Sequence, residues 1–235
     1  MELFDIVDEN GIPTGKTVER NVAHKDGIRH RSEHVWIARN TPTGTEVLMQ
    51  KRAMIKDSFP GRFDTSSAGH IRAGENPLES AVRELKEELG LNVTTNDLNF
   101  IDTFVINYEK EFHGKLFKDS EIAFVYAYTK PVDISKLVYQ IEEVETAEWF
   151  NLDYVIEECT KHNQKFCAPL NGLRLIRKYM QNNWITKSYG AVAIRKITAY
   201  IVFNWILVGD ERTTAYMKKA GAHTSTMPEA SIGYF

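Results

Sequence analysis

The sequence predicts an α/β protein built on a mixed β-sheet. Strand-like and helical segments interleave along the chain, without the regular β-α-β alternation of a parallel doubly wound sheet. One of the helical segments has a clear beginning and a clear end. The composition, with 43% hydrophobic and 26% charged residues, is that of a globular protein. A chain of 235 residues is also long enough to bury a core without disulfide or metal cross-links.

The N-terminal half is predicted to be rich in β-structure. Residues Leu3–Gly15 are expected to form a hairpin, because Glu9-Asn10-Gly11 supplies turn residues between two extended segments. Residues 40–44 form a turn cluster, and Asp57–Arg62 is expected to be a loop. Strands are expected at His34–Arg39, Glu46–Lys51, Asn99–Ile106, Glu121–Tyr128 and Thr146–Phe150.

The best-defined element is a helix that begins at Pro77 and ends at Leu89. Asn76 is suited to the N-cap, Pro77 to the first helical position, and Glu79 to the second half of a capping box. Gly90 is suited to the position that follows a helix. The apolar residues that recur at helical spacing, and so predict a buried stripe, are Leu78, Ala81, Val82, Leu85 and Leu89.

The C-terminal part is predicted to contain two more helices, over Asp153–Lys161 and Pro169–Asn182. We expect residues 1–185 to form one domain, and residues 186–235 to form an extension that packs on this domain or at an interface. The apolar stretch Ile197–Gly209 is shorter than the ~20 residues that span a bilayer. It is therefore interpreted as buried structure or as a subunit interface, which would be consistent with a homodimer.

Charge and cysteine content exclude several functional classes. The net charge is -3 and the pI is near 6.2, so no general field attracts a nucleic-acid polymer. Two cysteines are too few for a disulfide framework and indicate reduced thiols. The acidic N-terminus lacks the basic start and apolar run of a signal peptide. We therefore expect a cytoplasmic protein that does not enter a membrane.

Three carboxylates on the Pro77 helix suggest a metal site. Glu84, Glu87 and Glu88 are three and four residues apart, so they lie on one face, opposite the apolar stripe. Their mutual repulsion would be relieved by a hard divalent cation, and oxygen ligands suit Mg²⁺ or Mn²⁺. Arg83 could hold one of the carboxylates in place. Taken alone, the three glutamates would equally fit a solvated acidic face.

The surrounding sequence favours the metal site. From Gly69 the chain reads GHIRAGENPLESAVRELKEELGL, with Glu75 six residues on, followed by Arg83-Glu84-Leu85, Glu87-Glu88 and Gly90-Leu91. These nine positions within 23 residues resemble the Nudix box, so the chain is identified as a member of the Nudix hydrolase family. The flanking strands and the segment from Glu143 to Trp149 extend the resemblance to about residues 1–180.

The resemblance implies both a fold and a reaction. The fold is a mixed sheet between helices, an α/β/α sandwich. Glu84, Glu87 and Glu88, with Gly69, would form the metal site, where Gly69 allows the loop to approach the helix. Arg83 would orient the glutamates, and Glu75 would be a structural or outer carboxylate. The bound metal would activate water against a diphosphate. The general base stays open between Glu87, Glu88 and Glu143.

Four cations are candidates for binding the phosphates of a substrate. They lie on segments expected to flank the metal helix, where guanidinium and ammonium groups can hold phosphate oxygens. They are Lys51, Arg52, Arg62 and Arg72.

Other residues resemble the isopentenyl diphosphate isomerase branch of the Nudix fold. They lie in GIRHRSEHVWI, in DSFPGRFDTSSAGHI and in the stretch from Asp119 to Ile122. That branch builds a metal site from three histidines and two glutamates, and such a set can hold an octahedral divalent ion. The resemblance implies a second metal site here at His24, His30, His70, Asp119 and Glu121.

One departure from the isomerase pattern decides the predicted reaction. The isomerase has a catalytic cysteine at the position of Ala68, and a methyl group cannot transfer a proton. The predicted function is therefore a metal-dependent pyrophosphohydrolase that cleaves an organic, nucleoside-linked diphosphate. The alternatives are an isomerase of isopentenyl diphosphate, which Ala68 disfavours, and a non-catalytic binding module, which the complete glutamate set disfavours. The exact substrate stays open.

Overall fold

The fold is described from a computed structural model, in which residues 2–183 are placed. The predictions for residues 186–235, including the apolar stretch Ile197–Gly209, fall outside the described residues. No helix within residues 2–183 is long and apolar enough to cross a membrane.

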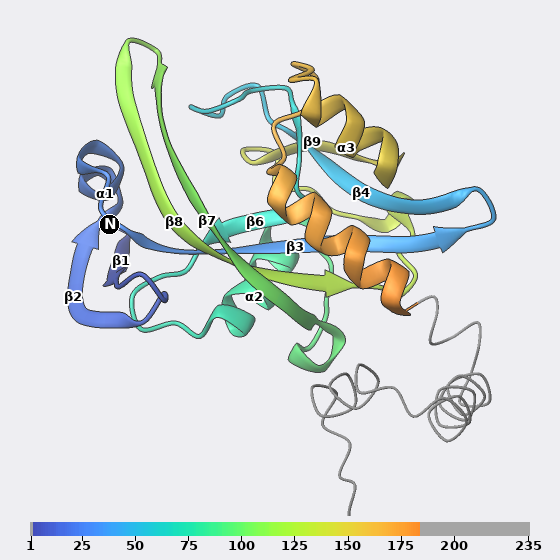
Figure 1. The fold of residues 1–235 in the computed structure, drawn as a ribbon, viewed down its shortest axis with the longest axis horizontal. Helices are drawn as coiled ribbons and strands as arrows, with labels where there is room; N and C mark the ends of the chain where they lie inside the picture. The colour runs from blue at the N-terminus through green and yellow to red at the C-terminus, as the bar shows by residue number, and fades with distance from the viewer. Residues whose placement is uncertain (1, 184–235) are drawn as a thin grey trace, which may run out of the picture. The chain divides into compact units, whose positions relative to one another are not determined.

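A seven-stranded sheet forms the centre of the structure (Figure 1). Its strands are β3 (His30–Thr41), β4 (Gly44–Arg52), β5 (Phe63–Asp64), β6 (Ser67–His70), β7 (Asn99–Phe112), β8 (Lys115–Tyr128) and β9 (Val144–Asn151). The order is β5-β4-β3-β8-β7, with β6 beside β3 and β9 beside β4. Strands β3 and β8 are parallel and the other pairs are antiparallel, so the sheet is mixed as predicted.

Helices cover both faces of this sheet. On one face, helix α2 (Pro77–Leu89) packs Ala81, Leu85 and Leu89 against Val35 and Ile37 of β3. On the other face lie α3 (Leu152–Thr160) and the helix over residues 170–183. Two short 3-10 turns are formed by Thr95–Asp97 and Ile134–Lys136. This arrangement confirms the predicted α/β/α sandwich.

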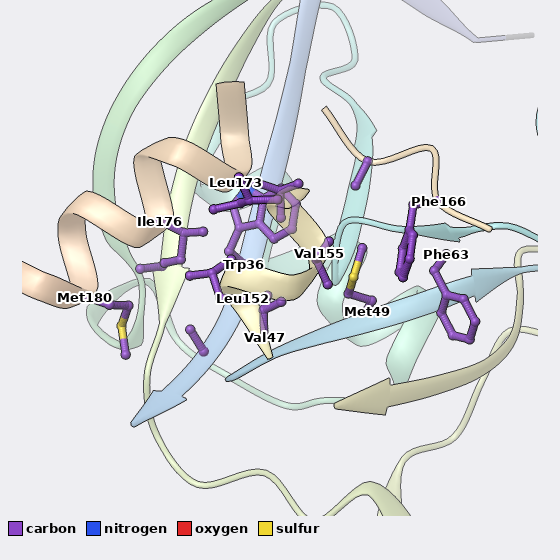
Figure 2. Close-up of a cluster of buried hydrophobic side chains, with 14 of the residues drawn as sticks. Trp36, Val47, Met49, Phe63, Leu152, Val155, Phe166, Leu173, Ile176 and Met180 are labelled. Carbon is purple, nitrogen blue, oxygen red and sulfur yellow. The ribbon is translucent and has the colours of Figure 1, made fainter. Parts of the chain in front are cut away.

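Trp36 is the centre of the core beneath α3. Its side chain is fully buried between Leu152 of α3 and Leu173 of the last described helix (Figure 2). The helix approaches closely at Gly172, where a Cβ would lie 2.9 Å from the indole ring. Burial of large apolar side chains of this kind contributes about 1.5–3 kcal/mol each. This core fixes β3, the strand that carries much of the candidate site.

The ends of α2 follow from local sequence. The Asn76 side chain accepts a hydrogen bond from the Leu78 amide (2.9 Å), and Gly90 ends the helix with a φ of 64°. The predicted capping box is wrong in its second half, because within the described residues the Glu79 carboxylate does not bond back to Asn76. The helix and its stripe are otherwise as predicted.

The N-terminal segment contains one element that the sequence did not predict. The expected hairpin is present as β1 (Leu3–Val7) and β2 (Pro13–Glu19). It is followed by a seven-residue helix, α1 (Arg20–Asp26), which ends at Gly27 with a φ of 70°. A helix this short has little local signal, and it is held by packing of Ala23 against Phe4.

Strands β7 and β8 extend well beyond their predicted bounds. Each has 14 residues, and the pairing continues to a tight turn at His113-Gly114. The predicted strands stopped at Ile106 and began again at Glu121, because residues 107–120 are mostly polar. A two-stranded ribbon that projects past the sheet can expose polar side chains on both faces. Figure 1 shows this hairpin extending past the sheet on the side of α1.

Candidate active site

A cavity of about 1830 Å³ lies between α1, α2, the β7–β8 hairpin and the loops around residues 53–59 and 140–143. Its floor is formed by β3 and β6. The cavity is lined by the three α2 glutamates (Glu84, Glu87 and Glu88) and by members of a second group that we call the histidine cluster. The histidine cluster consists of His24, His30, His70, Asp119 and Glu121. Both predicted ligand sets therefore belong to one region.

Arg83 organises two of the α2 glutamates. Its Nη1 donates to Glu84 Oε1 (2.5 Å) and to Glu87 Oε2 (3.1 Å), and its Nη2 donates to Glu75 Oε2 (3.1 Å). Arg83 thus links Glu75, Glu84 and Glu87, a geometry that would suit the orienting role predicted for Arg83. Glu88 is held separately by Gln50, whose Nε2 donates to Oε2 (3.3 Å). The three carboxylates therefore line the cavity with different positive neighbours: Arg83 compensates Glu84 and Glu87, whereas the charge of Lys56 acts on Glu88.

Burial disfavours the ionised form of two of the α2 glutamates, Glu84 and Glu88. Burial, together with repulsion from Glu84, raises the pKa of Glu88 to about 8. Burial also raises the pKa of Glu84, despite the neighbouring Arg83. A divalent cation at this point would favour the ionised carboxylates, so the donor set fits an oxygen-ligated ion such as Mg²⁺.

Gly69 allows α2 and β6 to meet. A Cβ at this position would lie 2.5 Å from Cδ of Glu84, so any side chain would displace that carboxylate. The absence of a side chain therefore places Glu84 directly against the backbone of β6, beside the cavity.

Glu33 is a buried acid that the sequence analysis missed. It lies in β3, opposite Gly69 in the β3–β6 ladder, and is fully buried. Neither carboxylate oxygen has a hydrogen-bond partner among the described residues. Burial, with added repulsion from Glu84 and Glu88, raises the pKa of Glu33 well above its usual range and so favours the protonated carboxyl. Glu33 was missed in the sequence analysis because no motif marks a single acidic residue within a strand as part of a site.

The histidine cluster is brought together by four separate elements. His24 comes from α1, His30 from β3, His70 from β6, and the two carboxylates from β8. The ring nitrogens of His24, His30 and His70 lie within 4.8 Å of one another, as do the ligand atoms of His30, Asp119 and Glu121. His70 Nε2 is 3.1 Å from Glu121 Oε1, and His30 Nε2 is 3.6 Å from the same oxygen.

Several buried ligand atoms of this cluster lack a partner. His24 has neither ring nitrogen hydrogen-bonded. His30 Nε2, His70 Nε2 and Asp119 Oδ1 also form no hydrogen bond of regular geometry within the described residues, although both Nε2 atoms face Glu121. Nδ1 of His30 donates to the Ile28 carbonyl (2.9 Å), which leaves Nε2 as the acceptor nitrogen. Buried polar atoms normally have partners. Three imidazoles and two carboxylates left in this state fit a divalent cation.

The charge state of the cluster supports the same interpretation. Burial, followed by repulsion from His70 and His30, lowers the pKa of His24 to about 3, so its imidazole is neutral. Burial alone would raise the pKa of Glu121, but His30 and His70 outweigh it and hold the pKa well below its usual range. Burial and the Glu121 charge raise the pKa of Asp119. Neutral imidazoles beside an ionised carboxylate are the forms that bind a metal.

The four predicted phosphate clamps separate into two pairs. Arg72 and Arg52 line the cavity, although Arg52 is already bound to Asp64 (3.2 Å) and to Ser58. Lys51 instead binds Glu145 (2.7 Å), and Arg62 lies over the ring of Phe59; neither lines this cavity. The cavity-lining cations that the sequence analysis did not name are Arg20, Lys25, Lys56 and Lys115.

Two other predicted positions also face the cavity. Glu143, a candidate general base, forms an ion pair with Lys56, so loop 53–56 and loop 140–143 are tied together. Ala68, at the position of the isomerase cysteine, lies in β6 and lines the cavity. The structure thus has a methyl group where that branch has its thiol.

Comparison with known proteins agrees with this geometry. The model of the NUDIX domain matches residues 30–168. Nudix hydrolase 3 of Arabidopsis thaliana is 39% identical over 150 residues, which are 63% of this chain and only 19% of that protein. An isopentenyl-diphosphate Delta-isomerase of Cereibacter sphaeroides is 30% identical over 151 residues, covering 63% of this chain and 78% of the relative.

A solved structure shares the fold. The crystal structure of DR0079 from Deinococcus radiodurans aligns with a TM-score of 0.54 at 16% identity, over 75% of this chain and 98% of that one. At this identity the likeness concerns the fold alone. The family model, which matches more than half of the chain, and the box around α2 lead to one conclusion: the chain belongs to the NUDIX domain family.

Proposed function

We propose that this protein is a divalent-metal-dependent pyrophosphohydrolase that cleaves an organic, nucleoside-linked diphosphate by attack of water at phosphorus. The observation that carries the proposal is the set of α2 glutamates, which is complete, lines a large cavity and includes two buried carboxyls whose raised pKa values a bound cation would lower. Curated relatives named Nudix hydrolase support the reaction class. A small molecule fits a cavity of this size better than a polymer does.

The side chains divide the reaction between them. Glu84, Glu87 and Glu88 would hold Mg²⁺ or Mn²⁺, with Gly69 keeping Glu84 at the cavity. Such an ion, when bound, would supply a lowered pKa for the attacking water and positive charge beside the diphosphate. Arg83 would keep the glutamates oriented, while Arg72, Arg52 and Lys56, which line the cavity, would face the phosphates.

The proton and bond changes need one basic side chain. Water attacks phosphorus, the bridging P–O bond breaks, and a carboxylate takes the proton of the water. Glu87, Glu88 and Glu143 remain the candidates. Glu143 has to share its carboxylate with Lys56, whereas Glu88 is free of any cationic partner among the described residues.

The test is a panel of nucleoside-linked diphosphates incubated with Mg²⁺. We expect release of phosphorylated products that a chelator stops, and a loss of at least ~100-fold in Glu88→Gln. Glu79→Gln is the matched control, because Glu79 is an exposed residue of the same helix. Product release that is indifferent to chelator, or equal in the two variants, would contradict the proposal.

One observation favours a second function, the isomerisation of isopentenyl diphosphate. The histidine cluster is assembled, and a relative at 30% identity carries the isomerase name. Ala68 argues against it, because it cannot donate or accept a proton. The same preparation should be incubated with isopentenyl diphosphate, and isomerisation without hydrolysis of any diphosphate would reverse the ranking of the two functions.

A further inference from the structure

His34 is a histidine on the cavity floor that belongs to neither ligand set. It lies in β3 opposite Ala68 of β6, two pairs along the ladder from Ser32 and His70. Residues that face each other in an antiparallel pair project to the same side of the sheet. His34 and Ala68 both line the cavity, and the His34 residue is only 6% exposed.

The protein holds the ring of His34 in one orientation. Nδ1 lies 3.4 Å from the hydroxyl of Thr65, and Phe104 packs edge-on against the ring with centroids 5.4 Å apart. Thr65 is itself fixed, since its amide donates to Asp64 Oδ1 (2.8 Å). Asp64 in turn accepts from Arg52 (3.2 Å). This chain of contacts leads from the cavity edge to one nitrogen of the imidazole.

The other nitrogen is left for a ligand. Nε2 of His34 has no hydrogen-bond partner among residues 2–183. Unlike Nε2 of the neighbouring His70, it is not fully buried. A histidine that served only to satisfy the core would have both nitrogens bonded or enclosed by apolar groups. His34 has one nitrogen anchored, and the other has access to the cavity.

The ring is also in the form that suits a phosphate oxygen. Burial lowers the pKa of His34, although Glu121 and Asp64 act in the opposite direction, so the imidazole is neutral near pH 7. The Thr65 hydroxyl lies 3.4 Å from both Asp64 Oδ1 and His34 Nδ1, and when it donates to Nδ1 the neutral imidazole carries its hydrogen on Nε2. It can then donate to an anionic oxygen without changing its charge.

We propose that His34 binds the substrate directly, donating a hydrogen bond from Nε2 to an oxygen of the diphosphate. The proposal rests on the hydrolase function and adds to it a binding residue, placed where the methyl group of Ala68 leaves the floor of the cavity open. No proton is transferred, because the hydrogen stays on His34 throughout. The residue thereby positions the diphosphate between the two ligand sets.

The test compares two substitutions whose amide groups occupy the positions of different ring nitrogens of His34. The amide of glutamine reaches to about the place of Nε2, whereas that of asparagine reaches only to Nδ1. For a hydrolysed diphosphate we expect His34→Asn to lower kcat/KM by about 10- to 100-fold, the range for a hydrogen bond to a charged group. We expect His34→Gln to stay within about threefold of the wild type. His162→Asn is the control, because His162 is exposed and does not line the cavity.

A purely structural role predicts the opposite order. Asparagine would keep the contact with Thr65 and glutamine would lose it, so His34→Gln would be the more damaged variant in both activity and melting temperature. That result, or equal activity of the two variants, would overturn the proposal. Binding of methylenediphosphonate with Mg²⁺, measured by calorimetry, should follow the same order as kcat/KM.

The outcomes also separate this proposal from the hydrolase function. Hydrolysis by the wild type with His34→Asn unaffected would overturn the role of His34 and leave the function intact. If the wild type neither hydrolyses a diphosphate nor binds methylenediphosphonate in the presence of Mg²⁺, both the hydrolase function and the role of His34 are overturned. A loss confined to His34→Asn supports both.

Discussion

The α2 glutamates and the histidine cluster line one cavity, but they are stabilised in different ways. Arg83 donates to Glu84 and Glu87, so this acidic face is partly compensated by the protein itself. The histidine cluster has no such cation, and five of its buried ligand atoms lack a partner within the described residues. We therefore expect a divalent ion at α2 to exchange readily with solvent and to be bound also by substrate phosphates. A divalent ion at the histidine cluster should be held more tightly by the protein.

The largest expected effect concerns the contact between β6 and α2. Gly69→Ala would place a methyl group 2.5 Å from Cδ of Glu84, so the carboxylate must move. Displacement of a ligand by about 1 Å can cost on the order of 100-fold in rate. We expect that loss in kcat with little change in melting temperature, since only the end of a flexible side chain shifts. Unchanged activity would mean that Glu84 does not act from this position.

A second variant tests whether the histidine cluster holds an ion independently. Glu121→Gln removes the charge that faces His30 and His70. We expect Co²⁺ affinity, measured from the visible spectrum of the bound ion, to fall by about 10- to 100-fold. Mg²⁺ binding at α2 should remain. Glu111→Gln, an exposed position of the same hairpin, is the control. Equal Co²⁺ binding by both variants would remove the distinction between the two ligand sets.

The pH dependence of Mg²⁺ binding at α2 sharpens the comparison further. Glu88, whose pKa is raised to about 8, is protonated below that pH in the metal-free protein, and the proton must leave before the carboxylate binds a metal. Mg²⁺ affinity should therefore rise about fivefold from pH 7 to pH 8 and then level off. Calorimetric titrations at several pH values would measure this rise. If Glu88→Gln keeps the same rise, another group is responsible.

The smallest effect is expected on stability, at Glu33. The folded pKa of Glu33 lies well above its unfolded value, so it destabilises the fold increasingly as the pH rises above about 4.5. Glu33→Gln should therefore stabilise the metal-free protein at pH 8 by about 1 kcal/mol or more, and have almost no effect at pH 4. Urea unfolding at the two pH values measures both. A gain that is equal at the two pH values would show that ionisation of Glu33 is not the cause.

The sequence was sufficient for α2 because a helix is a local structure. Asn76, Pro77 and Gly90 mark its ends, and helical periodicity places Glu84, Glu87 and Glu88 on one face. The members of the histidine cluster could be named only by resemblance. The helix that carries His24 was not predicted, since seven residues give too weak a periodic signal. Lys51 and Arg62 were expected near the substrate because only their distance along the chain was known.

The sequence by itself determined the course of α2 and the spacing of its carboxylates, because these depend on contacts within a few residues. The sandwich was predicted from the resemblance to the Nudix family. Only the tertiary structure decided that His30 lies beside Glu121, through the parallel register of β3 and β8. It also decided that His34 faces Ala68 and that Glu33 lies behind Gly69. These pairings join strands distant in sequence, and their register depends on packing of the whole sheet.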